Sequence, residues 1–209
     1  MFVAEQSLRE RKKQRTHQAI SDSAIRLFLE SGFEKVSVAE VAAAAEVSKP
    51  TLFKYFPTKE DLVLHRFADH TEEAATVVRE RPSDETPLDA LHRNFTRGLR
   101  ERDPITGLND DAEVVAFNRL LYGTPSLVAR LSQFTERSER ALAGALRTGG
   151  DELTALLAAG QIVTVQRLLA LENYRLIAAG AAADDRYPGA VADADRGFAL
   201  LRSGLSPYC

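Results

Sequence analysis

The sequence predicts an all-α fold, and three observations support this prediction. Apolar residues recur at the three- and four-residue spacing of amphipathic helices along most of the 209 residues. Alternating Val/Ile/Thr-rich segments bounded by Asn-Gly or Asp-Gly turns, the pattern of β-hairpins, are nearly absent. Glycine and proline gather at intervals that separate the helical segments. Roughly nine helices are therefore expected.

The first predicted helix begins near Thr16, a plausible N-cap residue. Ile20, Ala24 and Phe28 then follow at helical spacing. Gly32 stands where a helix commonly ends with a residue of positive φ, and the next residue, Phe33, can fold back as an apolar contact.

The second and third predicted helices are short and close together. Ser37 and Glu40 form an S-x-x-E capping box at the start of the second, which ends by Ala45 or Glu46. Ser48 is an N-cap for the third, with Pro50 in its first turn, where no intrahelical N–H is needed. This helix stops at proline 57. A fourth helix, capped by threonine 58, is expected to extend to about residue 80.

The remainder of the chain predicts a bundle of longer helices. The stretch 81–87 breaks the pattern, and Pro188-Gly189 is taken as another break. The expected helices cover residues 88–101, 110–122, 125–148, 151–180 and 189–204.

Charge is distributed unevenly along the chain. The net charge is −3, but residues 1–60 hold 10 Lys/Arg against 8 Asp/Glu, whereas residues 61–209 hold 17 against 22. Five of the seven residues in Arg9–Arg15 are basic, which suits phosphate binding by a basic N-terminal arm at 9–15, although an isolated run of this kind is more often a solvated tail.

Three short helices, the last two joined by a tight turn, are typical of a helix-turn-helix. Ala42 is small where the second and third helices cross, and Val47 is apolar at the corner between them. Leu52 and Phe56 are apolar and seat the third helix on the first. The other face of the third helix is polar and can reach bases and phosphates.

These residues resemble the TetR family over about 47 positions. The match includes A-I-x-x-x-A-x-x-L-F from Ala19 to Phe28 and S-V-A-E-V-A from Ser37 to Ala42. It continues with V-S-K-P-T-L-F-K-Y-F-P-T-K-E-D-L from Val47 to Leu62. The resemblance implies a helix-turn-helix DNA-binding domain at residues 1–60 and a ligand-binding and dimerisation domain at 61–209.

The resemblance also implies DNA-contacting residues. Lys49 and Thr51 match base-contacting positions, and Pro50 can contact a thymine methyl group. The matches to phosphate-contacting positions are Ser37, Ser48, Lys54, Tyr55 and Lys59. Three residues depart from the family pattern: Glu46 replaces a frequent glycine in the turn, Phe53 replaces a frequent tyrosine, and Ala39 replaces a base-reading side chain of some members.

For the C-terminal domain, the resemblance implies a homodimer through residues about 151–180 and 189–204. The first of these segments is apolar nearly all round, which indicates a helix that is central in the bundle or covered by a partner. The implied ligand is a small, largely apolar inducer that releases a repressor from a near-palindromic operator in double-stranded DNA. Candidate pocket residues are aromatic or polar groups among apolar neighbours, for each of which core packing or exposure to solvent is the simpler interpretation: His65, His92, Phe95, Phe117, Asn118, Leu121, Tyr122 and Tyr174.

Other functions receive little support. The sequence has no Glu-x-x-His pair, P-loop, G-x-S-x-G or G-x-G-x-x-G motif, so neither an enzyme nor a metal or cofactor site is expected. The first fifteen residues lack an apolar segment, so no signal peptide is expected. The only cysteine is residue 209, so no disulfide within the chain is expected, which fits a cytoplasmic protein. Residues 153–166 look too short and polar to cross a membrane. The alternative that stays open is a ligand- or protein-binding helical module whose helix-turn-helix does not bind DNA.

Overall fold

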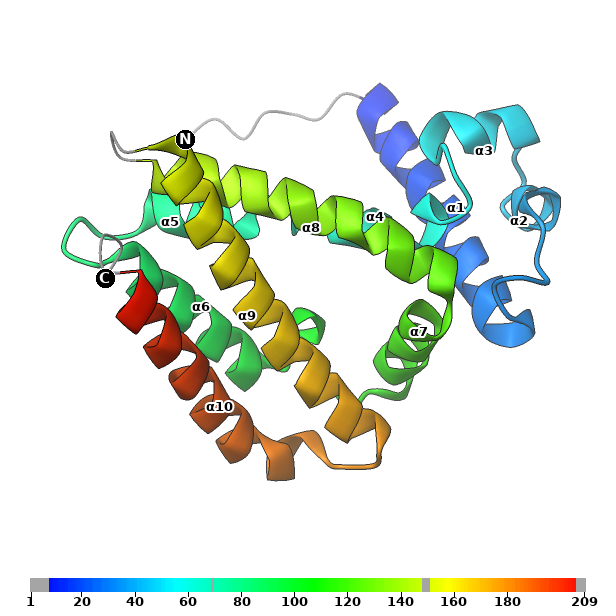
Figure 1. The fold of residues 1–209 in the computed structure, drawn as a ribbon. Helices are drawn as coiled ribbons and strands as arrows, with labels where there is room; N and C mark the ends of the chain where they lie inside the picture. The colour runs from blue at the N-terminus through cyan, green and yellow to red at the C-terminus, as the bar shows by residue number, and fades with distance from the viewer. Residues whose placement is uncertain (1–7, 69, 148–150, 206–209) are drawn as a thin grey trace. The chain divides into compact units, whose positions relative to one another are not determined.

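The computed structural model describes residues 8–68, 70–147 and 151–205, and these confirm the all-α prediction. The described ranges contain ten α-helices, one short 3₁₀ helix and no strand (Figure 1). They divide into two compact units, unit 1 (1–66 with 120–130) and unit 2 (67–119 with 131–209). The helices are α1 Leu8–Ser31, α2 Val38–Ala44, α3 Lys49–Tyr55, α4 Asp61–Ala68, α5 Glu73–Glu80, α6 Pro87–Glu101, η1 Pro104–Thr106, α7 Ala112–Gly123, α8 Pro125–Leu146, α9 Glu152–Ala178 and α10 Ala183–Gly204.

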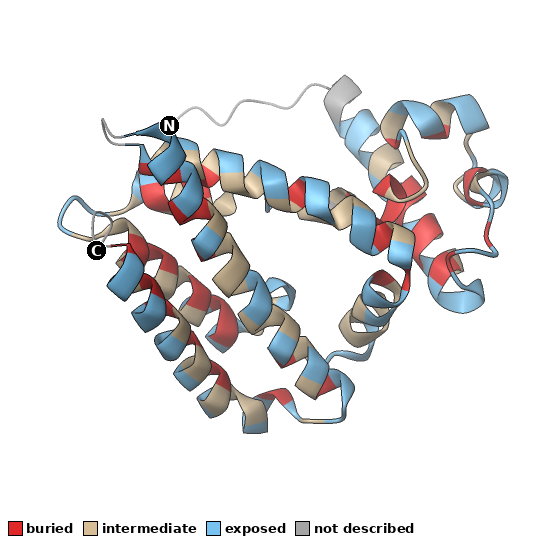
Figure 2. Ribbon diagram, in the orientation of Figure 1, coloured by how far each residue is buried: buried red, intermediate tan, exposed pale blue. Residues whose placement is uncertain are grey.

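The core of unit 1 is built on one face of α1. Ile20, Ala24 and Phe28 are spaced as predicted and are at most 1% exposed. Figure 2 shows buried segments in red. The helix ends as predicted at Gly32, whose φ is 89° and whose N–H donates to the carbonyl of Phe28 at 2.9 Å. Phe33 folds back against Phe28, with ring centroids 4.9 Å apart. This closed end fixes the direction in which the chain enters α2.

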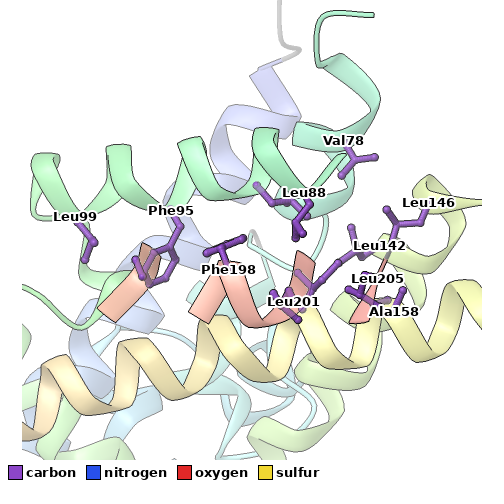
Figure 3. Packing of buried hydrophobic residues seen from close by; sticks show 14 of the residues in the cluster. Val78, Leu88, Phe95, Leu99, Leu142, Leu146, Ala158, Phe198, Leu201 and Leu205 are labelled. Atoms are coloured by element: carbon purple, nitrogen blue, oxygen red, sulfur yellow. The ribbon is translucent and has the colours of Figure 1, made fainter. Parts of the chain in front are cut away.

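Unit 2 has a larger core between α6, α9 and α10. Leu88, Phe95 and Leu99 line the buried face of α6 and lie beside Phe198 and other apolar residues of α10 (Figure 3). Phe198 is fully buried, so its replacement by alanine would remove about 3–5 kcal/mol of stability.

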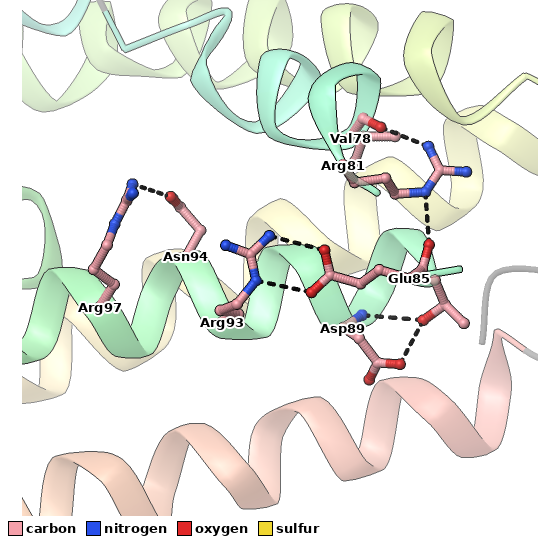
Figure 4. Close-up of polar contacts among 8 residues, drawn as sticks. Val78, Arg81, Glu85, Asp89, Arg93, Asn94 and Arg97 are labelled. Carbon is pink, nitrogen blue, oxygen red and sulfur yellow. Dashed lines mark hydrogen bonds and ion pairs between the residues drawn. The ribbon is translucent and has the colours of Figure 1, made fainter. Parts of the chain in front are cut away.

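A set of polar contacts shapes the connection between α5 and α6, where the sequence predicted a break (Figure 4). Arg81 donates to the carbonyls of Val78 at 2.5 Å and Glu85 at 3.0 Å. Arg93 binds both carboxylate oxygens of Glu85 at 2.8 Å, and this contact lowers the pKa of Glu85. Thr86 then caps α6, its hydroxyl accepting from the N–H of residue 89.

Three predicted helix boundaries were wrong. Helix α1 begins at Leu8, not near Thr16, because the intervening Arg, Lys, Glu and Gln residues are good helix formers even without apolar periodicity. The predicted fourth helix is two helices, α4 and α5. Between them the N–H groups of His70 and Glu73 bond three residues back rather than four, which interrupts the α-helical pattern.

The third error concerns Pro188, which lies inside α10. A proline there removes a single hydrogen bond, to the carbonyl of Asp184 in the first turn. Because Asp184 is exposed, water can solvate that carbonyl, and the helix continues.

Helix α9 has 27 residues and is, within the described ranges, the one helix whose length and apolar composition would allow it to cross a membrane. It is longer than the 153–166 stretch that looked too short. Core helices of soluble proteins can pass the same test, but only 22% of its most apolar window is buried within this chain. Several of its leucines are exposed: Leu153, Leu156, Leu157 and Leu168.

Candidate nucleic-acid interface

Helices α2 and α3 are held by the two predicted N-caps. The hydroxyl of Ser37 accepts from the Glu40 N–H at 3.2 Å, and the Glu40 carboxylate accepts from the Ser37 N–H at 2.7 Å. These bonds lower the pKa of Glu40, so the reciprocal cap is complete at neutral pH. At α3, the hydroxyl of Ser48 accepts from the Thr51 N–H at 3.2 Å. Both N-cap predictions are confirmed.

The turn between the two helices contains the non-glycine residue that the sequence flagged. Glu46 has a φ of 54°, in the left-handed region. Its N–H donates to the carbonyl of Ala43 at 3.1 Å, and the N–H of Val47 donates to Ala42 at 2.9 Å. These two hydrogen bonds close the turn. The left-handed backbone of Glu46 is unfavourable because the residue has a side chain.

We expect Glu46→Gly to stabilise the chain by about 0.5–1 kcal/mol, since relief of the left-handed strain outweighs the extra freedom of glycine in the unfolded state. Urea unfolding measures the change. Gly32→Ala is the matched control: its φ is 89° and an added Cβ would meet no atom within 4 Å, so it introduces left-handed strain without a steric clash and should destabilise by a similar amount. A loss of stability in Glu46→Gly would show that the Glu46 side chain makes a stabilising contact.

Helix α3 is buried on one face and exposed on the other. Leu52 and Phe56 are 0% and 1% exposed, which confirms that they seat the helix. The opposite side presents an exposed stripe, here called the α3 stripe, which consists of Lys49, Pro50, Phe53 and Lys54. Residues at these spacings lie on one face of a helix, so the four side chains form a continuous surface.

Phe53 is the residue of this stripe that sequence reasoning left out of the DNA-contacting set. Its side chain is 39% exposed, and the Lys49 Nζ lies 6.0 Å from its ring centroid. Its position at i+4 from Lys49 was the available signal, but an aromatic residue in a short helix is more often part of the core.

Three other predicted contacts are engaged within the chain. The hydroxyls of Ser48 and Thr51 lie 2.8 Å apart, and Thr51 is half-buried. The Nζ of Lys59 donates to the carbonyl of Phe33 and lies 4.3 Å from the Phe33 ring centroid. In this conformation Lys59 ties the segment before α4 to the end of α1, so a contact with phosphate would require its side chain to move.

The last predicted contact, Tyr55, lies beside a cluster of rings behind α3. It is half-buried, with its ring centroid 6.3 Å from that of His17 of α1. His17 packs against Phe56 at 4.4 Å and against His65 of α4 at 5.0 Å. His65, a candidate pocket residue, also has its Nε2 3.0 Å from the hydroxyl of Ser21. These contacts give His65 a packing role between α1, α3 and α4.

The structure divides the candidate pocket residues between the two units: His65, Leu121 and Tyr122 belong to unit 1, and the other five belong to unit 2. His92 stacks on Phe198 at 4.6 Å, with its Nε2 2.9 Å from Asp195, and Phe95 is 8% exposed in the core. Phe117 stacks on Phe67 at 6.5 Å, Asn118 and Tyr174 are half-buried, and burial raises the pKa of Tyr174. Leu121 is fully buried and Tyr122 is 37% exposed. Four of the eight thus have ring-packing partners: His65, His92, Phe95 and Phe117.

A capped three-helix unit with a tight α2–α3 turn and an exposed basic stripe on α3 defines a helix-turn-helix protein. Comparison with known proteins agrees. Residues 20–65 match the profile of bacterial regulatory proteins of the tetR family. The HTH-type transcriptional regulator TcmR of Streptomyces glaucescens is 35% identical over 147 residues, which are 69% of this chain and 65% of that relative. The helix-turn-helix unit of this chain therefore matches the TetR family.

Other relatives match over shorter stretches or by fold alone. The putative mycofactocin biosynthesis transcriptional regulator MftR of Mycobacterium tuberculosis is 40% identical over 60 residues, 29% of this chain and 30% of that relative. The matched segment thus spans just under two thirds of TcmR and under a third of MftR.

Two solved structures share the fold over most of both chains. NalD of Pseudomonas aeruginosa, the secondary repressor of the MexAB-OprM multidrug efflux pump, has a TM-score of 0.59 at 18% identity, covering 88% of this chain and 96% of that one. FadR of Bacillus subtilis in complex with stearoyl-CoA has a TM-score of 0.55 at 18% identity, covering 90% and 98%.

Proposed function

We propose that this chain is a sequence-specific DNA-binding transcriptional regulator, acting as a repressor that a small, largely apolar ligand releases from its operator. The observation that supports this most directly is the α3 stripe. Its two lysines are exposed on a helix whose other face is fully buried at Leu52. An α-helix fits the major groove of B-DNA, and a rigid helix presents its side chains to bases in a fixed register.

The proposed regulator acts as a homodimer through α9 and α10. The exposed leucines of α9, with Leu200 of α10 at 69% exposure, give these helices an apolar surface that the chain itself leaves in water. A second copy of the same helices would cover it, as a four-helix arrangement about a two-fold axis. Two α3 helices related in this way require an inverted-repeat operator.

The release of the regulator from DNA by a ligand is proposed from the family and from the similar fold of FadR. FadR holds stearoyl-CoA on a similar fold, which supports a largely apolar ligand for the helical domain, that is, residues 61–209. Such a ligand changes DNA affinity only if it binds the DNA-competent and DNA-incompetent states differently. We propose that it does so by moving α4, which follows the helix-turn-helix directly in the chain. The same regulator would act in the cytoplasm and need no metal, cofactor or enzymatic step.

The first test is selection of bound sequences from a random duplex pool at two salt concentrations, followed by Lys49→Glu/Lys54→Glu. We expect an inverted repeat whose affinity falls steeply with salt. The double variant should lose at least a hundredfold in affinity, since a base contact contributes about 1–3 kcal/mol and a phosphate contact adds to it.

Arg26→Glu is the matched control, because Arg26 is an exposed basic residue of the same unit on α1. It should retain most of the affinity. Both variants should keep the helical content and unfolding midpoint of the parent chain. If no sequence is enriched by the folded, ligand-free protein, the alternative of a helical binding module that does not contact DNA takes the place of this proposal.

A further inference from the structure

Helix α1 extends beyond the part of unit 1 that it packs against. It begins at Leu8, but its first fully buried residue is Ile20. Thr16 and His17 are half-buried, and every described side chain from Arg11 to Arg15 is exposed. The preceding turns therefore project from the core as a helical segment. Four of its five exposed residues are basic: Arg11, Lys12, Lys13 and Arg15.

The basic residues of this projection do not share one face. Residues four apart lie above one another on a helix, so Lys13 stands one turn before His17 on the same side. His17 contacts Phe56 and Tyr55 at the end of α3. Lys13 therefore lies on the side of α1 that faces α3, and Figure 1 shows the N-terminal end of α1 and helix α3 at the same end of unit 1.

Arg11 and Arg15 lie on the opposite side of the same helix. Their stripe continues at three- and four-residue spacing through Gln18 and Asp22, which are exposed and hydrogen-bonded to each other at 2.8 Å. The α1 projection thus carries Lys13 toward α3 and two arginines away from it, whereas Lys12 lies between these two sides.

The helical form of the projection also decides how it can meet DNA. A helix with its side chains is about 10–12 Å across, whereas the minor groove of B-DNA is about 6 Å wide. The described part of the projection cannot enter the minor groove as an extended arm would. It can lie across the sugar-phosphate backbone, where a lysine acts as a point charge beside a phosphate.

We propose that Lys13 extends the DNA interface from α3 onto α1 by contacting a backbone phosphate of the operator, outside the major groove that α3 enters. This inference rests on the proposed DNA-binding function. It adds α1 to the interface and places the contact on the side of α1 that faces α3. Tyr55 of α3 lies beside His17 of α1, one turn after Lys13, so the two helices are adjacent at this point. The contact is independent of base sequence, so it strengthens binding and does not contribute to specificity.

The test compares Lys13→Gln with Arg15→Gln on the selected operator, over a salt series from 50 to 200 mM. Each variant removes one positive charge from the same exposed segment. Loss of one phosphate contact lowers the slope of log affinity against log salt by about 0.9, so the ratio of parent to Lys13→Gln affinity should fall about threefold over this range. Arg15→Gln should change the slope by much less.

A second experiment tests whether the projection contacts the minor groove. Replacing flanking G·C pairs by inosine·C removes the amino group from the minor groove only. We expect this change to leave both the parent affinity and the Lys13→Gln effect unaltered. A large effect of inosine that depends on Lys13 would overturn the backbone contact.

The remaining outcomes separate this inference from the proposed function. Equal slope changes in the two variants, or no change in either, would overturn a directed contact by Lys13, although operator binding itself would stand. Absence of any operator binding by the parent chain would instead overturn the proposed function. Circular dichroism and the unfolding midpoint should be unchanged in both variants, since neither side chain packs against the core.

Discussion

Replacing Leu157 by glutamate is expected to convert the chain to a monomer and to lower its affinity for a two-half-site operator by about a hundredfold or more. The Leu157 side chain is 58% exposed in the single chain, next to Leu153 at 60% on the same face of α9. In the proposed dimer these side chains are buried against their copies, and an unpaired carboxylate there would lose its hydration without gaining a partner. Because linked binding of two modules gains about 10²–10⁴ in affinity over one, a monomer should lose that factor.

Light scattering after size-exclusion chromatography measures the mass, and titration of the operator measures the affinity. Val128→Glu is the control, since Val128 is 43% exposed on α8, outside the proposed dimer surface. It should stay dimeric and bind normally. If Leu157→Glu stays dimeric at micromolar concentration, the exposed face of α9 is not the dimer interface.

The local features of the helix-turn-helix could be predicted because each depends on residues close together in the sequence. The Ser37–Glu40 cap and the positive φ of Gly32 follow from the stereochemistry of two or three neighbouring residues. Glu46 was singled out only by the resemblance to a family with a frequent glycine at that position, and its own residue type did not predict a left-handed backbone. The same applies to Leu52 and Phe56, whose spacing on a short helix indicates the buried side.

Helix limits were harder to predict where no apolar pattern marks them. The first turns of α1 are charged, so periodicity placed the start at the first buried turn and missed the projection that carries Lys13. Pro188 was taken as a break because a sequence does not reveal whether the carbonyl that a proline leaves unpaired is exposed to water.

Contacts between distant residues could not be predicted from one sequence. One example joins Asp61, the first residue of α4, to Arg130 of α8, 69 positions later. Asp61 carried only the signal of an acidic residue in a first helical turn. Nothing in the residues around position 130 indicated its partner.

The Asp61–Arg130 pair holds the beginning of α4, and we expect its loss to be costly. Arg130 donates through Nη2 to Asp61 Oδ1 at 3.0 Å and through Nε to the same oxygen at 3.2 Å. The other oxygen, Oδ2, accepts from the N–H of Thr58 at 3.1 Å, and the Thr58 hydroxyl accepts from the Asp61 N–H at 3.2 Å. The side chains of Asp61 and Arg130 are only 13% and 29% exposed, so solvent screens the pair incompletely.

Arg130→Met should therefore lower the free energy of unfolding by about 2 kcal/mol, because it leaves a largely buried carboxylate without its main partner. Asp61→Asn should cost less, since the amide oxygen can still accept from Thr58. The double variant should be more stable than the sum of the two losses predicts, with a coupling of about 1 kcal/mol or more.

Arg140→Met on the same helix α8 is the matched control for this cycle. Its ion pair with Glu136 has a similar distance, 3.2 Å, but the two side chains are 70% and 56% exposed, so its removal should change stability by less than about 0.5 kcal/mol. Urea unfolding of all four variants completes the measurement.

Equal losses in Arg130→Met and Arg140→Met would mean that burial does not strengthen the Asp61–Arg130 pair. A clear difference would identify the contact that fixes α4 next to the helix-turn-helix, and repeating the cycle on operator affinity would then measure how much DNA binding depends on that position.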